Sequence, residues 1–217
     1  MTFRQRVRAP DSYGLLLVLI LASLIAAASS GRPIGQAVTV VLQGGTLLYA
    51  LWTARAGRRV VRVAVVLVPA IVLAAAVLTG GESDTADAVV PVTSAVLTAA
   101  AILLIVRRVG AHPRVDAAAI LGALCTYLLI GMFFSAVFGS VSEFQNAAFF
   151  AQEASAASVD LLYFSFVTMT TVGYGDLTAA TNLGRMLAVT EALIGQLYLV
   201  TVVALVIGNI GRERRAR

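Results

Sequence analysis

Long apolar runs alternate with short polar connections along the chain. A helix that crosses a membrane needs roughly 20 consecutive, mainly apolar residues. A shorter apolar run covers residues 159–170, and a run of that length fits a re-entrant helix that enters the membrane and turns back. The pattern predicts an all-α membrane protein with six transmembrane helices, a re-entrant helix and a loop after it. The six long runs are residues 13–30, 34–53, 60–79, 88–106, 117–139 and 185–210.

Composition supports this pattern. Of the 217 residues, 59% are hydrophobic and 12% are charged, and the mean hydropathy is +0.92. These values are far from those of a soluble domain and are typical of a polytopic membrane protein. The sequence contains no nucleophile–base pair, metal-ligand cluster or phosphate-binding loop. We therefore expect no enzyme activity, no cofactor and no nucleic-acid partner.

Arginines predict the orientation in the membrane. Positively charged residues accumulate in cytoplasmic loops, and six spans with both termini inside place four arginine groups in the cytoplasm. The outer connections are acidic, which modestly raises the local cation concentration. We expect a multi-pass protein of the cell membrane with both termini cytoplasmic and with arginines that contact anionic lipid. The groups are Arg4, Arg6 and Arg8; Arg55, Arg58, Arg59 and Arg62; Arg107, Arg108 and Arg114; and Arg212, Arg214, Arg215 and Arg217.

The N-terminal segment has a second interpretation. Three arginines, the apolar residues 15–25 and the alanines at 26–28 resemble a cleaved signal peptide. Retention is favoured because the apolar run is long for a signal peptide and pairs with the next run as a hairpin. Cleavage leaves five spans and does not change the pore region.

The most specific string follows the short apolar run. A dehydrated cation needs a ring of oxygens in place of its water, and backbone carbonyls supply one where an extended chain aligns them on an axis. Gly173 and Gly175 tolerate the backbone angles that this alignment requires. Thr171 can add a hydroxyl oxygen, while Val172 and Tyr174 are expected to point away and brace the loop. The string is Thr171-Val172-Gly173-Tyr174-Gly175-Asp176.

Residues 163–176, with Gly184-Arg185 and Gly195, resemble the pore module of tetrameric potassium channels, specifically the bacterial ion-channel family with a two-helix pore. The resemblance covers residues 115–217, nearly half of the chain. It implies a homotetramer, because the chain has one such loop and four close the ring. It also implies that K⁺ binds at Thr171, Val172, Gly173 and Tyr174, with Gly175 completing the selectivity filter.

The resemblance gives further residues a supporting role. Tyr163 and Phe164 are expected in an aromatic cuff behind the filter or, alternatively, as anchors at the membrane interface. Thr170 supports the filter, and Asp176 holds the outer mouth or forms a hydrogen bond behind the filter. Gly195 matches the position of an inner-helix hinge, although glycine also permits close helix packing.

Two polar features belong to this region. Ser158 is a candidate N-cap of the pore helix, with Asp160 in its first turn. Glu191 is an ionisable residue well inside the last span, where such residues are costly and face protein or water. We expect Glu191 to be either a proton-sensitive modulatory acid that bonds to the pore-helix end near residues 168–171, or a permanently satisfied structural acid.

The chain divides near residue 110. Residues 1–110 form a predicted four-helix transmembrane domain of unknown role, and residues 111–217 form the pore domain with its outer helix, pore helix, filter and inner helix. A voltage sensor carries arginines within its fourth span, but residues 89–106 contain none. We therefore expect no strong voltage gating.

These observations predict a potassium-selective channel that conducts K⁺ passively. Two alternatives stay open at this point. One is a regulatory or sensory membrane subunit that keeps the pore fold and binds a partner or lipid through its first four spans. The other is a less selective cation channel. The intact Gly173 and Tyr174 favour conduction and selectivity.

Overall fold

The computed structural model describes residues 10–28, 33–53, 70, 84–110, 117–145, 148–152 and 157–215. This part of the chain is helical apart from its connections and one isolated β-bridge between Phe150 and Ala179. Except for residue 70, the third predicted span lies outside these ranges. The helices are α1 (Pro10–Ala28), α2 (Pro33–Thr53), α4 (Asp84–Gly110), α5 (Ala117–Gln145), α6 (Ser158–Met169) and α7 (Asn182–Arg215).

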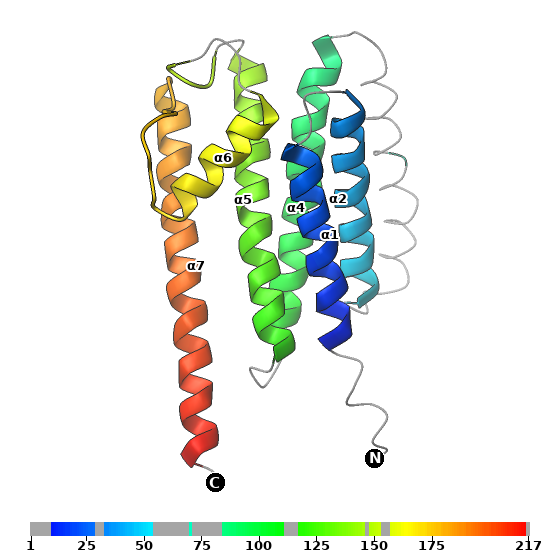
Figure 1. Cartoon of the computed structure of the whole chain (residues 1–217), viewed down its shortest axis with the longest axis vertical. Helices are drawn as coiled ribbons and strands as arrows, with labels where there is room; N and C mark the ends of the chain where they lie inside the picture. The colour runs from blue at the N-terminus through cyan, green and yellow to red at the C-terminus, as the bar shows by residue number, and fades with distance from the viewer. Residues whose placement is uncertain are drawn as a thin grey trace.

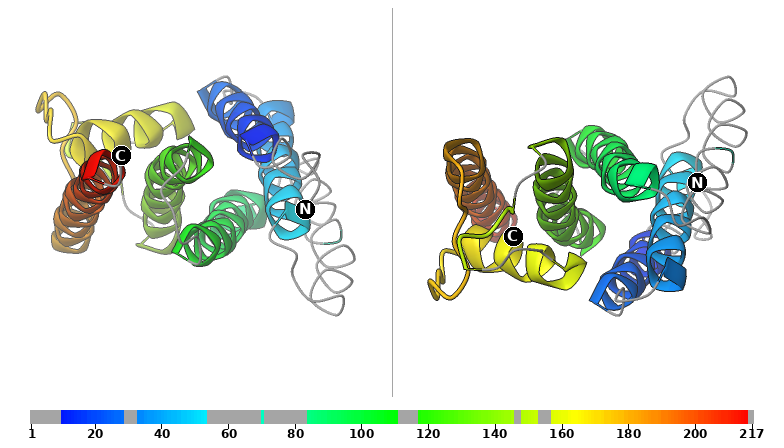
Figure 2. Two further views of the ribbon diagram at one scale, coloured as in Figure 1. Left: turned by 90° about the horizontal axis from the view of Figure 1, so that it is seen from below. Right: turned by 90° about the horizontal axis from the view of Figure 1, so that it is seen from above.

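Helix α5 joins two groups of helices (Figures 1 and 2). On one side α4 packs against α5, α2 against α4, and α1 against α2, α5 and α6. On the other side α6 and α7 pack against α5 and against each other. The described helices of the first 110 residues therefore lie beside the outer helix of their own chain. Figure 1 also shows that α1 begins and α7 ends at the same end of the molecule.

Three described helices are long and apolar enough to cross a membrane, by length and composition. They contain the stretches Val89–Arg107, Ala118–Gln145 and Asn182–Leu205. The shorter apolar helices cover Tyr13–Ala27, Val38–Leu51 and Ser158–Met169. The protein is thus all-helical with at least three membrane-capable helices. Helices α4, α5 and α7 extend beyond the predicted runs because a helix can continue after its apolar stretch ends.

Two apolar clusters hold the helices together. The first lies among α1, α2, α4 and α5, with Tyr13, Leu16 and Ile20 of α1 fully buried. The second surrounds α6 and consists largely of phenylalanines whose rings meet edge to face or tilted. The buried rings of this second cluster are Phe134, Phe138, Phe149, Phe150 and Phe164.

Candidate functional site

Helix α6 and the residues after it form a re-entrant path (Figure 1). The helix descends from the upper end of α5 to about the middle of α7, and residues 170–181, here called the return loop, climb back to the start of α7. The N-cap of α6 is Ala157, and the Asp160 carboxylate accepts a hydrogen bond from the Ala157 amide at 3.2 Å. The prediction that Ser158 caps the helix is wrong, because the capping bond comes from the first turn.

The end of the return loop is tied to residues that precede α6. Ala151 N donates to Thr178 O at 2.9 Å, and Ala180 N donates to Phe149 O at 2.9 Å. The Gln152 side chain adds two bonds to Thr178, one to its hydroxyl and one from its amide. The descending helix and the ascending loop are therefore fixed to each other at the upper end.

The backbone of residues 171–175, here called the TVGYG segment, alternates in handedness. Thr171, Gly173 and Gly175 have φ angles of 60°, 54° and 79°, while the residues between them do not have positive φ. Positive φ at every second residue allows successive carbonyls to turn toward one side of the chain, which is the arrangement that a ring of backbone carbonyls requires. Glycine adopts such angles without cost, as expected for Gly173 and Gly175. The left-handed Thr171 was not predicted, because threonine disfavours this conformation.

Amide hydrogen bonds hold the start of this segment against α6. Val172 N and Gly173 N both donate to Val167 O, at 3.0 and 3.3 Å, and Thr171 N donates to Thr168 O at 3.0 Å. Thr170 lies at the helix end, where its hydroxyl donates to Phe166 O at 2.6 Å. No carbonyl of residues 171–175 accepts a hydrogen bond within the described part of the chain. These oxygens are therefore free to coordinate a cation.

Tyr163 and Asp176 support the outer part of the segment. The Tyr163 hydroxyl donates to Asp176 Oδ2 at 2.7 Å, and the Tyr163 ring stacks on Tyr174 with centroids 6.4 Å apart. This hydrogen bond to a carboxylate raises the pKa of Tyr163 to about 12. Phe164 does not join them, because it is buried against the rings of Phe138 and Phe150.

Val172 and Tyr174 are not braced by their own chain to the extent expected. Val172 is 52% exposed and Tyr174 is 70% exposed. Apart from the Tyr163 ring, the described part of the chain leaves these two side chains largely uncovered.

Gly195 places α7 against the end of α6. A Cβ at this position would lie 2.5 Å from Met169 Cγ and 3.1 Å from Met169 O. The neighbouring Gln196 donates from Nε2 to the same carbonyl at 3.4 Å. Helix α7 runs through this point as one continuous helix. The observed geometry thus favours close packing, the second of the two interpretations of Gly195.

Glu191 is fully buried, with 0% relative exposure, between α7 and α6. Its partner is the Ser165 hydroxyl, with 2.5 Å between the oxygens, which lies about one turn before the predicted contact region at residues 168–171. The same hydroxyl lies 2.7 Å from Gly131 O of α5. Ser165, which was not predicted as a site residue, therefore connects three helices.

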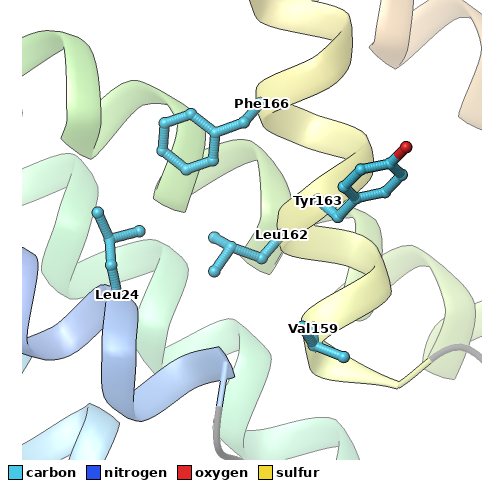
Figure 3. A pocket seen from close by; sticks show the side chains of 5 residues that line it. All are labelled: Leu24, Val159, Leu162, Tyr163 and Phe166. Carbon is cyan, nitrogen blue, oxygen red and sulfur yellow. The ribbon is translucent and has the colours of Figure 1, made fainter. Parts of the chain in front are cut away.

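A hollow of about 320 Å³ lies between α1 and α6. Figure 3 shows Leu24 of α1 facing Leu162 and Phe166 of α6 across it. Val159 and Tyr163 complete its lining. The first helix thus approaches the rear of the helix that holds the TVGYG segment.

Comparison of the sequence with protein families gives one match. Residues 122–211 match a family model described as "Ion channel". The match starts within α5, includes α6 and the return loop, ends within α7, and covers less than half of the chain. No curated protein matches the chain. The family match supports an ion-channel domain, and hence ion transport rather than enzymatic catalysis, for this segment.

Proposed function

We propose that the protein is a potassium-selective channel in which K⁺ passes along the backbone carbonyls of residues 171–175. The TVGYG segment carries this proposal. Its carbonyls form no hydrogen bond in the described part of the chain, and every second residue is left-handed. Such a row of oxygens can replace the hydration shell of K⁺. The ion-channel family match covers the same residues.

The direction of α6 also favours a cation. The helix ends at Met169, next to the middle of α7 (Figure 1). A helix C-terminus carries a partial negative charge of roughly half an elementary charge. In a channel this end faces the water-filled cavity below the filter and favours a cation there. In this proposal K⁺ is the ion that passes through the channel and is not a cofactor.

The channel that we propose is a homotetramer. One chain supplies one row of oxygens, whereas four such loops surround the ion. Val172 and Tyr174 also need neighbours, and only 11% of the α7 span is buried within its own chain. A stripe of exposed apolar residues runs along α7 and is available for other copies or lipid: Leu183, Met186, Val189, Leu193, Leu197 and Val200.

The proposal includes a place in the cell membrane with both termini cytoplasmic. Helix α1 begins and α7 ends at the same end of the molecule (Figure 1), which supports both termini lying on one side of the membrane. The TVGYG segment then runs outward from the membrane centre, with Asp176 at the outer mouth. Exposed Arg107, near the end of α4, lies on the cytoplasmic side, where anionic lipid headgroups can bind arginine.

Reversal potentials in liposomes test the proposal. Purified protein is reconstituted under opposing K⁺ and Na⁺ gradients, and its mass is compared with four times the 22.6 kDa chain. Gly173→Ala is the test variant and Gly45→Ala its matched control, because an added Cβ meets nothing within 4 Å at either site. Of these two glycines, only Gly173 has a positive φ. A left-handed alanine costs about 1–2 kcal/mol, or about 4–8 kcal/mol over four copies.

We expect a potential near the K⁺ limit in wild type and Gly45→Ala, and loss of the selective current in Gly173→Ala. Equal permeation of K⁺ and Na⁺ by wild type would instead identify a less selective cation channel. A folded tetramer without flux under any stimulus would contradict conduction and favour the regulatory-subunit alternative.

A further inference from the structure

Glu191 has the burial of a core residue and the chemistry of an acid. Its side chain has 0% relative exposure, and Oε2 has no hydrogen-bond partner among the described residues. A carboxylate in such surroundings requires a cation or several donors, and a group that lacks both takes up a proton instead. The surroundings of Glu191 therefore decide its charge.

No described group supplies a positive charge to Glu191. From α5, the titratable group that faces it is Tyr127. On α6, Asp160 accepts from the Ala157 amide and Tyr163 donates to Asp176. On α7 itself, Arg185 donates to the Ala179 carbonyl. The described hydrogen-bond partner of Glu191 is thus the neutral Ser165, and the named charged groups are bonded elsewhere.

Counting hydrogens at Ser165 leads to the same conclusion. Ser165 Oγ lies 2.7 Å from Gly131 O and 2.5 Å from Glu191 Oε1. A hydroxyl carries one hydrogen and cannot donate to both oxygens, and a carbonyl has none to give. Both contacts are full two-centre hydrogen bonds only if Ser165 donates to Gly131 O and a protonated Glu191 donates to Ser165 Oγ, because a single hydrogen shared between two acceptors forms two weaker bonds. Oε2 is then an uncharged carbonyl oxygen, which costs less to leave unpaired than a carboxylate oxygen.

The three bonded residues lie directly behind the TVGYG segment. Ser165 precedes Val167 by two residues in α6, and Val167 O accepts the amides of Val172 and Gly173. Next to the Ser165 bond, a Cβ on Gly131 would lie 2.9 Å from the Phe166 ring, so α5 and α6 are in close contact here. A shift of α6 at Ser165 would displace the carbonyl to which the segment is bonded.

We propose that Glu191 is a neutral carboxylic acid that fixes α6 to α7 and α5 through Ser165, and that its ionisation releases α6. The burial and the distances alone support the neutral Glu191 and its bond to Ser165. The second part, a loss of K⁺ conduction when Glu191 ionises, rests on the proposed channel function. Glu191 acts as a positioning residue, since its contact is with Ser165 and not with the ion.

The pH dependence of stability follows from the protonation state of Glu191 that the native structure favours. The neutral acid donates to Ser165, whereas the carboxylate can only accept and competes with Gly131 for the single Ser165 hydrogen. The stabilisation is therefore complete at low pH and is lost as rising pH ionises Glu191 in the folded protein. Glutamine keeps a donor at this position and does not titrate, so Glu191→Gln should abolish this pH dependence.

Infrared spectroscopy tests the protonation without any measurement of conduction. The purified full chain at neutral pH should show the carbonyl stretch of a protonated carboxylic acid. This band should disappear in Glu191→Gln and persist in Glu143→Gln, which removes an exposed glutamate from the end of α5. Isotope labelling of glutamate in the wild type provides the same test without a variant. Absence of a protonated band in the labelled wild type would overturn the proposal, as would its survival in Glu191→Gln.

Thermal unfolding and K⁺ flux across a pH series test the consequence. In wild type and Glu143→Gln, the melting temperature and the K⁺ flux should both fall as pH rises. In Glu191→Gln, neither should fall. Parallel pH profiles for wild type and Glu191→Gln would refute the release of α6. Absence of flux in every protein would refute the channel function alone, because the infrared band and the melting temperatures would still decide the state of Glu191.

Discussion

Replacing Gly195 by alanine distinguishes close packing of α7 on α6 from a hinge. The added Cβ would lie 2.5 Å from Met169 Cγ and 3.1 Å from Met169 O. Overpacking of this kind costs about 1–3 kcal/mol, and the better helix propensity of alanine offsets about 1 kcal/mol. We expect Gly195→Ala to destabilise each chain by about 0–2 kcal/mol and to reduce K⁺ flux, because Met169 directly precedes the return loop.

A double-mutant cycle with Met169→Ala makes the test specific. Met169→Ala removes Cγ, the nearest atom to the added Cβ, and by itself costs about 2–5 kcal/mol because Met169 is fully buried. If the two sites are in contact, Gly195→Ala becomes tolerated in this background, with a coupling of about 0.5–3 kcal/mol. Thermal unfolding of the four proteins measures the coupling, with Gly45→Ala as a helical glycine that has open space.

Additive effects on stability, combined with a loss of flux that Met169→Ala does not relieve, would refute the packing argument. That result would restore the hinge interpretation of Gly195. A hinge depends on the freedom of the α7 backbone, and shortening a neighbouring side chain does not return that freedom.

Two further substitutions address the supports of the TVGYG segment. Tyr163→Phe removes the bond to Asp176 and should reduce selective K⁺ flux while the ring stack persists. Since the pKa of Tyr163 is raised from 10.0 to about 12, this bond should be intact below pH 10 and lost through about pH 12. A phenolate absorbance titration should therefore show one fewer late-titrating tyrosine in Tyr163→Phe than in wild type. Ser165→Ala should destabilise the chain by about 1–3 kcal/mol, whereas Ser140→Ala, whose hydroxyl bonds within α5, should change stability by less than about 0.5 kcal/mol. Equal losses from the two serines would contradict a special role for Ser165.

The helices and the segment between α6 and α7 could be predicted from sequence because both are local properties. Apolar runs specify helices whatever packs against them, and glycines at 173 and 175 permit the observed positive φ angles. The predicted helix ends differ from the observed ones because an apolar run reports the membrane-embedded part of a helix. The N-cap was wrongly assigned to Ser158 for a local reason as well. The side chain of Asp160, in the first turn of α6, also accepts a hydrogen bond from a free amide at the start of the helix.

The contacts between helices could not be predicted in the same way. Tyr163 and Phe164 are adjacent, and adjacent residues of a helix point about 100° apart, so Tyr163 reaches Asp176 while Phe164 enters the phenylalanine cluster. The partner of Glu191 was misplaced by about one turn because it depends on how α7 crosses α6. Ser165 gave no signal, since a lone serine in an apolar helix is common and its importance comes from Gly131 and Glu191.

Helix α1 lies close to α6, the helix that holds the TVGYG segment. Leu24 of α1 and Phe166 of α6 line the same hollow (Figure 3). Phe166 is covalently next to Val167, whose carbonyl accepts two amides of the segment. We expect a displacement of α1 toward or away from α6 to reach the segment within one turn of helix, without movement of α7. Such an effect would need no arginine-bearing sensor, because α1 and α6 are in contact beside the hollow.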